Sequence, residues 1–218
     1  MYKDHATIIH LDSATERLPL IDAIKDCLPW QIDIFSAKDG TDWQKSNVIS
    51  KSHPLTKAPI SLGNIGCTQS HLCILESALK AGEEHTILFE DDCELLGTRE
   101  EIHAFLENAP KGWDILLLGA SEYVEYTVQD TYAKVGRFWG THAMVVSKKA
   151  MAAAIEAFTD AQKKEIFLPA DWMYNEAIKK KKLSCYAPIK VDALCRQKPG
   201  LVSAINGKVR NAPIQLPS

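Results

Sequence analysis

The stretch TILFEDDCEL, residues 86–95, places a short apolar run directly before three consecutive carboxylates. Branched and aromatic residues dominate the run, which is typical of a buried strand. Because side chains alternate faces along a strand, we expect Glu90 and Asp92 to project to one side and Asp91 to the other. Two carboxylates at a strand end suit Mg²⁺ or Mn²⁺ held against phosphate oxygens, so we predict that Glu90 and Asp92 bind such an ion. An acidic strand-to-loop turn is the alternative interpretation.

The composition of the 218 residues is that of an ordinary globular protein, with 46% hydrophobic and 24% charged residues. The formal charge of −3 gives no general attraction to nucleic acid or to an anionic membrane. Four lysines at 179–182 form the end of a predicted amphipathic helix, where they suit the helix dipole. We therefore expect no nucleic-acid partner.

The six cysteines form no C-x-x-C pair and no Cys/His spacing typical of a zinc site, so we expect reduced thiols. The first apolar run, residues 6–11, is too short for a signal peptide or a membrane span. These features predict a cytoplasmic protein without a transmembrane segment. Peripheral membrane association through a partner stays open.

Short strands alternate with helices along the chain. Strands are expected at 6–11, 32–35, 86–90, 114–118, 142–146 and 186–191, and helices at 18–28, 66–82, 98–107, 148–158 and 171–182. Residues 41–62 are expected to be mostly loop, and residues 121–132 a polar connection. The alternation predicts a three-layer α/β domain with a mostly parallel central sheet and its ligand at the carboxyl ends of the strands.

We assign residues 1–196 to this single domain. Residues 197–218 contain three prolines and two glycines and show no period, which predicts a C-terminal tail or lid.

Several motifs resemble one known family. The segment GCTQSHL (66–72), a following helix and ILFEDD (87–92) closely resemble the centre of glycosyltransferase family 25, which includes lipooligosaccharide and collagen galactosyltransferases. Similar segments occur in the expected order across residues 6–203: IHLD (9–12) with Arg17, AKDG (37–40), WDILLLG (113–119), GTHA (140–143) and PAD (169–171).

The resemblance implies a GT-A-type nucleotide-sugar-binding fold. It also implies the metal-assisted, inverting transfer of a hexose, commonly galactose from UDP-galactose, to a saccharide or glycoconjugate hydroxyl, as in lipopolysaccharide biosynthesis. The implied cofactor is Mn²⁺ or Mg²⁺. The nucleotide-sugar-binding candidates are Leu11, Asp12, Arg17, Ala37, Asp39, Ser70, His71 and Asp91.

Some of these candidates also have structural interpretations. Arg17 could form a salt bridge on a helix surface, and Asp39 could be a turn former. His71 could be a buried structural histidine. Asp91 could hold a neighbouring loop instead of contacting the ribose or the sugar.

An inverting transfer needs a base to take the proton of the acceptor hydroxyl, and Asp171 is the candidate. An aspartate after Pro169 could also be a helix N-cap. Trp139 and Trp172 could offer apolar faces to sugar rings or serve as packing residues. In the tail, Lys208 and Arg210 could close over the diphosphate.

Two other functions remain open from the sequence. The chain could be a non-catalytic nucleotide-sugar-binding relative that acts as a scaffold or partner subunit. A glycosidase is less favoured, because its two carboxylates must flank the scissile bond, and strand residues that point the same way do this poorly.

Overall fold

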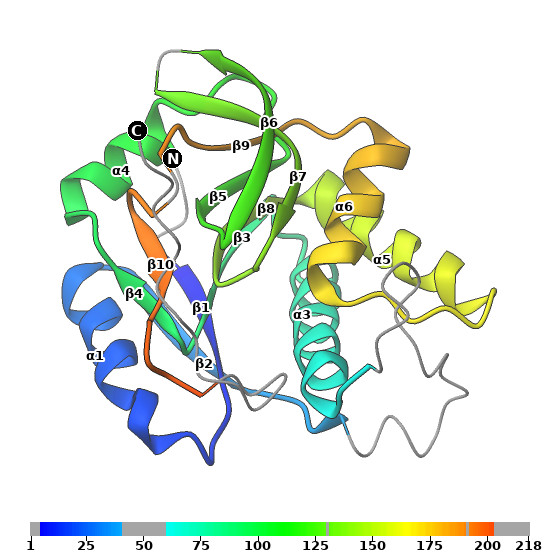
Figure 1. The fold of residues 1–218 in the computed structure, drawn as a ribbon, viewed down its shortest axis with the longest axis horizontal. Coiled ribbons are helices and arrows are strands. Elements are labelled where there is room, and N and C mark those ends of the chain that lie inside the picture. Colours follow the sequence, from blue (N-terminus) through cyan, green and yellow to red (C-terminus); the bar gives the residue numbers. More distant parts are fainter. Residues whose placement is uncertain (1–4, 41–59, 130, 191, 203–218) are drawn as a thin grey trace.

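The computed structural model describes residues 5–40, 60–129, 131–190 and 192–202. A central sheet lies between two groups of helices, α1 and α4 on one face and α3, α5 and α6 on the other (Figure 1). The helices are η1 (Thr15–Arg17), α1 (Leu18–Cys27), α3 (Leu62–Lys80), α4 (Arg99–Glu107), α5 (Lys148–Gln162) and α6 (Ala170–Lys181). The strands are β1 (His5–His10), β2 (Gln31–Ser36), β3 (His85–Glu90), β4 (Cys93–Leu95), β5 (Ile115–Gly119), β6 (Glu122–Gln129), β7 (Tyr132–Trp139), β8 (Ala143–Ser147), β9 (Cys185–Pro188) and β10 (Cys195–Gln197).

The main sheet has eight strands in the order β2-β1-β3-β8-β5-β9-β7-β6. β1 is parallel to β2 and β3, and β5 is parallel to β9. β8 opposes both of its neighbours, and β7 opposes β9 and β6. Six strands therefore run in one direction and only β7 and β8 run in the other, which confirms the predicted mostly parallel α/β sheet.

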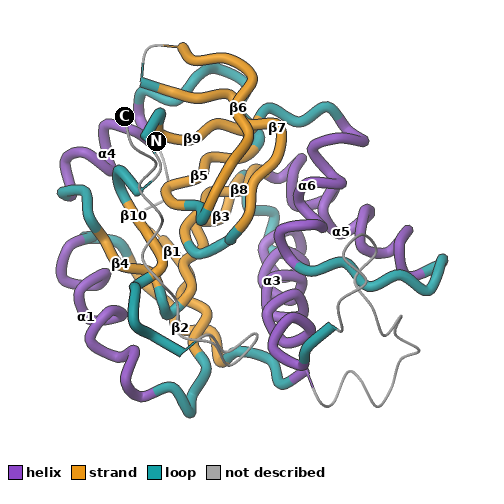
Figure 2. Tube along the Cα trace, viewed as in Figure 1, coloured by secondary structure: helices purple, strands orange, loops and turns teal. Residues whose placement is uncertain are grey.

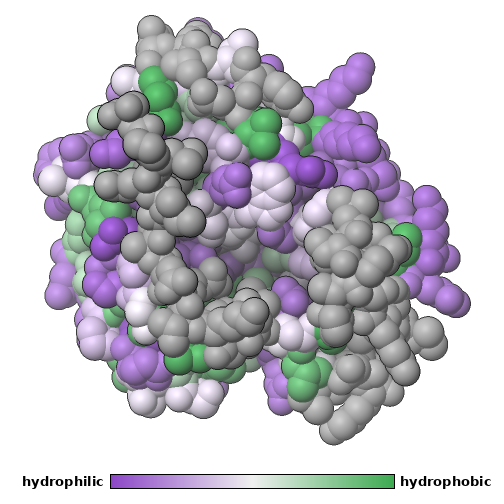
Figure 3. Space-filling view, in the orientation of Figure 1, coloured by the Kyte–Doolittle hydropathy of each residue, from purple (hydrophilic) through white to green (hydrophobic). Residues whose placement is uncertain are grey.

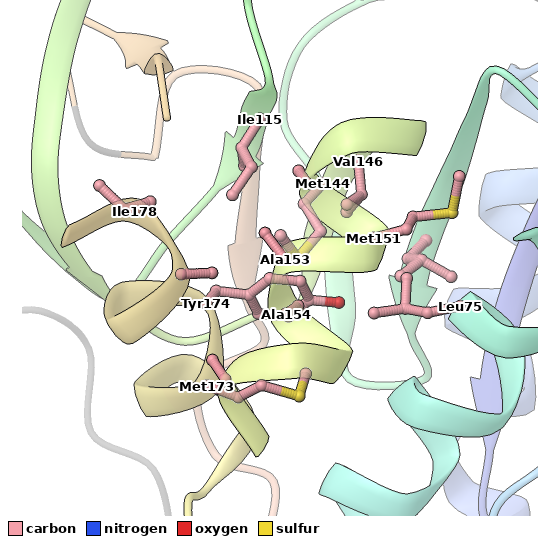
Figure 4. Packing of buried hydrophobic residues seen from close by; sticks show 14 of the residues in the cluster. Leu75, Ile115, Met144, Val146, Met151, Ala153, Ala154, Met173, Tyr174 and Ile178 are labelled. Carbon is pink, nitrogen blue, oxygen red and sulfur yellow. The ribbon is translucent and has the colours of Figure 1, made fainter. Parts of the chain in front are cut away.

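Successive residues of β3 pack on opposite faces of the sheet. Leu88 belongs to the hydrophobic cluster under α3, α5 and α6, whereas Ile87 and Phe89 belong to the cluster under α1 and α4. Figure 4 shows part of the first cluster, where side chains from α3, α5, α6 and β8 meet. The same alternation directs Glu90 toward α3 and Asp91 toward η1, as the contacts of both side chains show.

Helix starts follow local capping chemistry. Thr98 and Ser147 are the N-caps of α4 and α5, and Thr98 forms a reciprocal capping box with Glu101, as its spacing favours. The helix expected from residue 66 begins earlier, at Leu62, because Ser61 and Asn64 cap each other in the same reciprocal way. Residues 41–59 of the expected loop lie outside the described part of the chain.

Two sheet features differ from the sequence-based expectation. The segment expected to be a polar connection contains β6, which forms an antiparallel hairpin with β7 (Figure 2). The three-residue strands β4 and β10 pair with each other across about a hundred residues of sequence. Neither feature has a hydrophobic period that would reveal it.

Among the described residues visible in Figure 3, apolar side chains do not gather into one patch. Hydrophilic side chains dominate the edge where α5 and α6 lie, and the visible apolar ones are scattered. All six cysteines are free thiols. Among the described helices, none combines the length and the apolar character that crossing a bilayer requires.

Two backbone segments approach each other so closely that only glycine fits between them. A Cβ atom at Gly66 would lie 2.2 Å from the carbonyl oxygen of Lys38, and one at Gly40 would lie 2.1 Å from that of Leu62. Ser70 strengthens this approach, because its hydroxyl accepts a hydrogen bond from the Lys38 N–H at 2.9 Å and donates one to the Gly66 carbonyl at 2.7 Å. The start of α3 is thereby held against the loop after β2.

A buried ion pair ties the end of β3 to the first turn after β1. Arg17 Nη1 lies 2.5 Å from Asp91 Oδ1, and the two residues are 5% and 4% exposed. Asp91 Oδ2 also accepts a hydrogen bond from the Leu11 N–H at 2.9 Å and contacts His10 Nδ1 at 2.9 Å. Burial disfavours the charged guanidinium, yet the Asp91 charge and hydrogen bond hold the pKa of Arg17 above its ordinary value.

We predict that Asp91→Asn lowers the free energy of unfolding by about 3–5 kcal/mol, because it removes the nearest counter-charge of a buried guanidinium and leaves only the longer contact with the exposed Glu16, at 3.8 Å. Glu84→Gln is the matched control: its exposed pair with Lys148, at 3.1 Å, should contribute less than about 1 kcal/mol. Urea unfolding measures both. Equal losses for the two variants would contradict the structural role assigned to Asp91.

Candidate functional site

A cavity of about 300 Å³ opens at the carboxyl ends of β1, β2 and β3. Seven of the sequence-predicted residues line it: Leu11, Arg17, Ala37, Asp39, Glu90, Asp91 and Asp92. The amino-terminal turns of α3 close the opposite wall with Leu62, Gly63, Gly66 and Cys67. An open α/β sheet places its ligands at this edge, so the fold brings these candidates together where a ligand would bind.

Three predicted binding residues lie outside this cavity wall. Asp12 is exposed, and its Oδ2 accepts a hydrogen bond from Ser36 Oγ at 2.7 Å. Ser70 and His71 are fully buried, and their hydrogen bonds go to other parts of the protein. In the structure these polar atoms position the surrounding backbone and side chains, and the contact of Ser70 and His71 with a nucleotide sugar stays a prediction.

The main partner of His71 is Glu90. Glu90 Oε1 accepts hydrogen bonds from His71 Nε2 at 3.2 Å and from Thr141 Oγ1 at 2.5 Å. The other imidazole nitrogen, Nδ1, lies 3.2 Å from the hydroxyl of Tyr174. Burial raises the pKa of Glu90, but the hydrogen bonds and the nearby histidines outweigh it and lower that pKa to about 2. Glu90 is thus a fixed negative charge at any pH near neutral.

A second cavity, of about 210 Å³, lies on the other side of Glu90. Glu90 and Cys67 line both cavities, so they form the wall that the two share. The remaining lining residues come from the start of α3, from the link between β5 and β6, from the end of β7 and the turn after it, from the start of α6 and from the end of β10: Asn64, Ser121, Trp139, Gly140, Thr141, Pro169, Ala170, Asp171 and Gln197.

Asp171 lies in the first turn of α6 and lines this second cavity. Pro169 occupies the N-cap position, so the alternative interpretation of Asp171 as the cap is wrong. Asp171 Oδ1 accepts a hydrogen bond from the Trp172 N–H at 2.8 Å. Burial raises the pKa of Asp171 above its ordinary value, and the Glu90 charge adds to this, although backbone N–H groups of Trp172 and Gly140 act in the opposite direction. A buried carboxylate with a raised pKa in a cavity is a candidate for proton transfer.

Two sets of side chains could hold a metal ion. Glu90 and Asp92 both line the first cavity, and two carboxylates with phosphate oxygens are the ligand set that Mg²⁺ and Mn²⁺ prefer. Cys67, His71 and Glu90 form the other set, with one ligand atom from each within 4.8 Å of the others. Sulfur and imidazole nitrogen favour a softer ion such as Zn²⁺. Glu90 belongs to both sets. An ion bound by either set would therefore lie beside the wall that the two cavities share.

The described start of the predicted tail runs along the first cavity. The N–H of Lys198 donates to the Asp92 carbonyl at 2.8 Å, and Arg17 Nη2 donates to the Val202 carbonyl at 2.8 Å. Residues 203–218 lie outside the described part of the chain, and with them Lys208 and Arg210. The boundary between residues 196 and 197 stays a prediction.

Sequence reasoning did not select Cys67, Thr141 or Gln197 as site residues, although they line the second cavity. A signal existed for Cys67, because it precedes His71 by four residues and so shares a helix face with it. Thr141 lies in the GTHA segment (140–143), whereas Gln197 has no comparable local signal and is brought to the site by long-range folding.

Known proteins resemble the chain at the levels of sequence and fold. A curated relative from Anopheles gambiae, described as a glycosyltransferase 25 family member, is 26% identical over 132 residues, which cover 56% of this chain and 22% of the relative. The chain therefore spans about a fifth of the length of that relative.

Two solved structures are similar in fold. A glycosyltransferase involved in the glycosylation of the major capsid of PBCV-1 is 10% identical, with 90% of this chain and 93% of that chain covered and a TM-score of 0.50. A Drosophila galactosyltransferase in complex with manganese, UDP-Gal and xylobiose is 9% identical, with 86% and 65% covered and a TM-score of 0.44. The first similarity agrees with the sheet topology in identifying a GT-A-type α/β fold.

The family comparison covers most of the chain. Residues 3–165 match the sequence model of Glycosyltransferase family 25 (LPS biosynthesis protein). The matched region contains β1, α3, β3 with its carboxylates, and β8. The chain belongs to glycosyltransferase family 25.

Proposed function

We propose that the chain transfers a hexose, with galactose expected, from a UDP-sugar to a hydroxyl of a saccharide or glycoconjugate, with inversion. One observation carries this proposal: two cavities share the wall formed by Glu90 and Cys67, with Asp92 facing the first and Asp171 facing the second. A transferase needs two such sites, one for the donor and one for the acceptor, that meet where the bond is exchanged.

The donor is assigned to the larger cavity. Leu11, Ala37 and Asp39 lie where a base and ribose are expected beside the first strands of an α/β sheet. The carboxylate of Asp91 accepts hydrogen bonds from Arg17 and from the Leu11 N–H, so we assign it the role of holding the loop after β1 in place beside the nucleotide.

Glu90 and Asp92 would hold Mn²⁺ or Mg²⁺ against the diphosphate. When bound there, such an ion supplies Lewis-acid stabilisation of the negative charge that develops on the leaving phosphate oxygen. Because Glu90 Oε1 already accepts hydrogen bonds from His71 and Thr141, that carboxylate is fixed before any ligand binds. This prior fixation lowers the cost of assembling the site.

Asp171 is assigned the role of general base in the smaller cavity. It takes the proton of the acceptor hydroxyl while the acceptor oxygen bonds to the anomeric carbon and UDP departs with the electrons of the broken bond. A base works best when its pKa approaches the operating pH, and burial raises the pKa of Asp171 in that direction. The nearby Glu90, with a pKa of about 2, stays ionised and cannot protonate it at neutral pH.

The metal assignment predicts that Mn²⁺ tightens UDP binding by about tenfold or more, a coupling of about 1.4 kcal/mol. Asp92→Asn should remove the tightening, because it deletes a ligand oxygen, whereas Asp12→Asn should keep it, since Asp12 lies outside the cavity wall. Titration calorimetry with and without Mn²⁺ measures this. Tightening that survives Asp92→Asn but is lost in Cys67→Ser would move the ion to the Cys67–His71–Glu90 set.

If Asp171 is the general base, the rate of UDP release from UDP-galactose, with water as the acceptor, should depend on pH. The rate should fall as pH drops through the pKa of Asp171, with a midpoint above the ordinary aspartate value, because only the deprotonated carboxylate accepts a proton. Asp171→Asn should lower the plateau rate by about 10²–10⁴-fold and should abolish the fall in rate at low pH.

Asp12→Asn again serves as the control and should leave the pH profile of UDP release unchanged. An unchanged pH profile in Asp171→Asn would overturn the assignment of Asp171 as the base. Tight UDP binding with no UDP release by the unmodified protein would instead support a non-catalytic sugar-nucleotide-binding protein.

A further inference from the structure

An arginine lies between two tryptophans beside the smaller cavity. The guanidinium carbon of Arg137 is 5.0 Å from the ring centroid of Trp172 and 5.5 Å from that of Trp139. Trp139 itself lines the cavity, and Trp172 follows Asp171 in the first turn of α6. Arg137 therefore lies next to Trp139, which lines the same cavity as Asp171.

The fold brings these three side chains together for separate reasons. Arg137 and Trp139 are two residues apart on β7, so they share one face of the strand, while Phe138 between them is fully buried on the other. The side-chain amide of Asn175 on α6 bonds both backbone groups of Phe138, at 3.0 Å and 2.7 Å. This clamp fixes α6, and with it Trp172, beside β7 (Figure 1).

The guanidinium of Arg137 has two aromatic neighbours. Arg137 is exposed, and within the side chains that the structure describes it takes part in no ion pair. Stacking on an aromatic face leaves the N–H groups at the edge of the guanidinium free to bind a planar or tetrahedral anion in a bidentate way. The flat indole of Trp139 can at the same time contact the apolar face of a sugar ring.

We infer that the smaller cavity selects an anionic saccharide, one that carries a carboxylate or phosphate which Arg137 binds while the sugar ring lies against Trp139. This inference rests on the proposed function, since it names the acceptor class of that same site. The acceptor hydroxyl would face Asp171, and the anionic group would lie at the outer rim. A neutral sugar would keep the contact with Trp139 and lose the interaction with Arg137.

The test is a binding titration that does not require catalysis. Trp139 and Trp172 flank the site, so tryptophan fluorescence of the full chain should respond to glucose, glucuronate and glucose 6-phosphate, each added with saturating UDP and Mn²⁺ to fill the donor cavity. We expect both anionic sugars to bind about tenfold or more tightly than glucose. Arg137→Gln should remove this preference, and Arg137→Lys, which keeps the charge without the planar stack, should retain part of it.

Lys134→Gln is the control, because it removes the same charge from an exposed position on the same strand. Equal affinities for the three sugars, no binding of any of them, or a preference that survives Arg137→Gln would each overturn the inference. Thermal unfolding of each variant shows whether it is folded. UDP release from UDP-galactose is measured in parallel and tests the proposed transferase separately. Absence of UDP release would count against the transferase. The preference for anionic sugars in the fluorescence titration would count for or against the role of Arg137.

Discussion

The ion pair between Arg17 and Asp91 is the interaction on which the arrangement of the site depends. It joins the loop after β1 to the end of β3, and the carboxylate also binds the N–H of Leu11. Both charges are almost completely buried, so neither can leave the other without a large desolvation cost. The middle carboxylate of the acidic triplet therefore belongs to the scaffold, whereas Glu90 and Asp92 line the first cavity. Arg17 also binds the Val202 carbonyl, which brings the described start of the tail to the same edge.

A second constraint is that Glu90, together with Cys67, lines both cavities. Glu90 ends β3 on the α3 side, where His71 and Thr141 hold it, and its carboxylate lies in the wall between the larger and smaller cavities. A substitution at His71 should thus affect both cavities, although His71 lines neither. Burial is the main reason that the pKa of Asp171 is raised, and the charge of the ionised Glu90 adds to it.

Local patterns predicted much of the fold and only part of the site. The apolar run before Glu90 identified β3, and strand alternation correctly separated the faces of Glu90 and Asp91. Strand alternation does not reveal which distant residue contacts each face of β3. The ion pair of Asp91 with Arg17 was therefore not predictable from residue spacing. Ser70 and His71 belong to a recognisable motif, yet the motif does not distinguish a residue that contacts a ligand from one that positions its neighbours. The hairpin of β6 and β7, which carries Arg137 and Trp139, has no hydrophobic period and emerges only from tertiary pairing.

If the three adjacent carboxylates divide their roles as proposed, anomalous diffraction from crystals grown with UDP and Mn²⁺ should reveal the division. We expect a manganese peak between the diphosphate and the carboxylates of Glu90 and Asp92, with uridine in the cavity lined by Leu11 and Asp39 and the Arg17–Asp91 pair intact. A peak bound by Asp91, with Arg17 displaced, would show that the roles are assigned wrongly. So would a peak among Cys67, His71 and Glu90 that leaves Asp92 without metal.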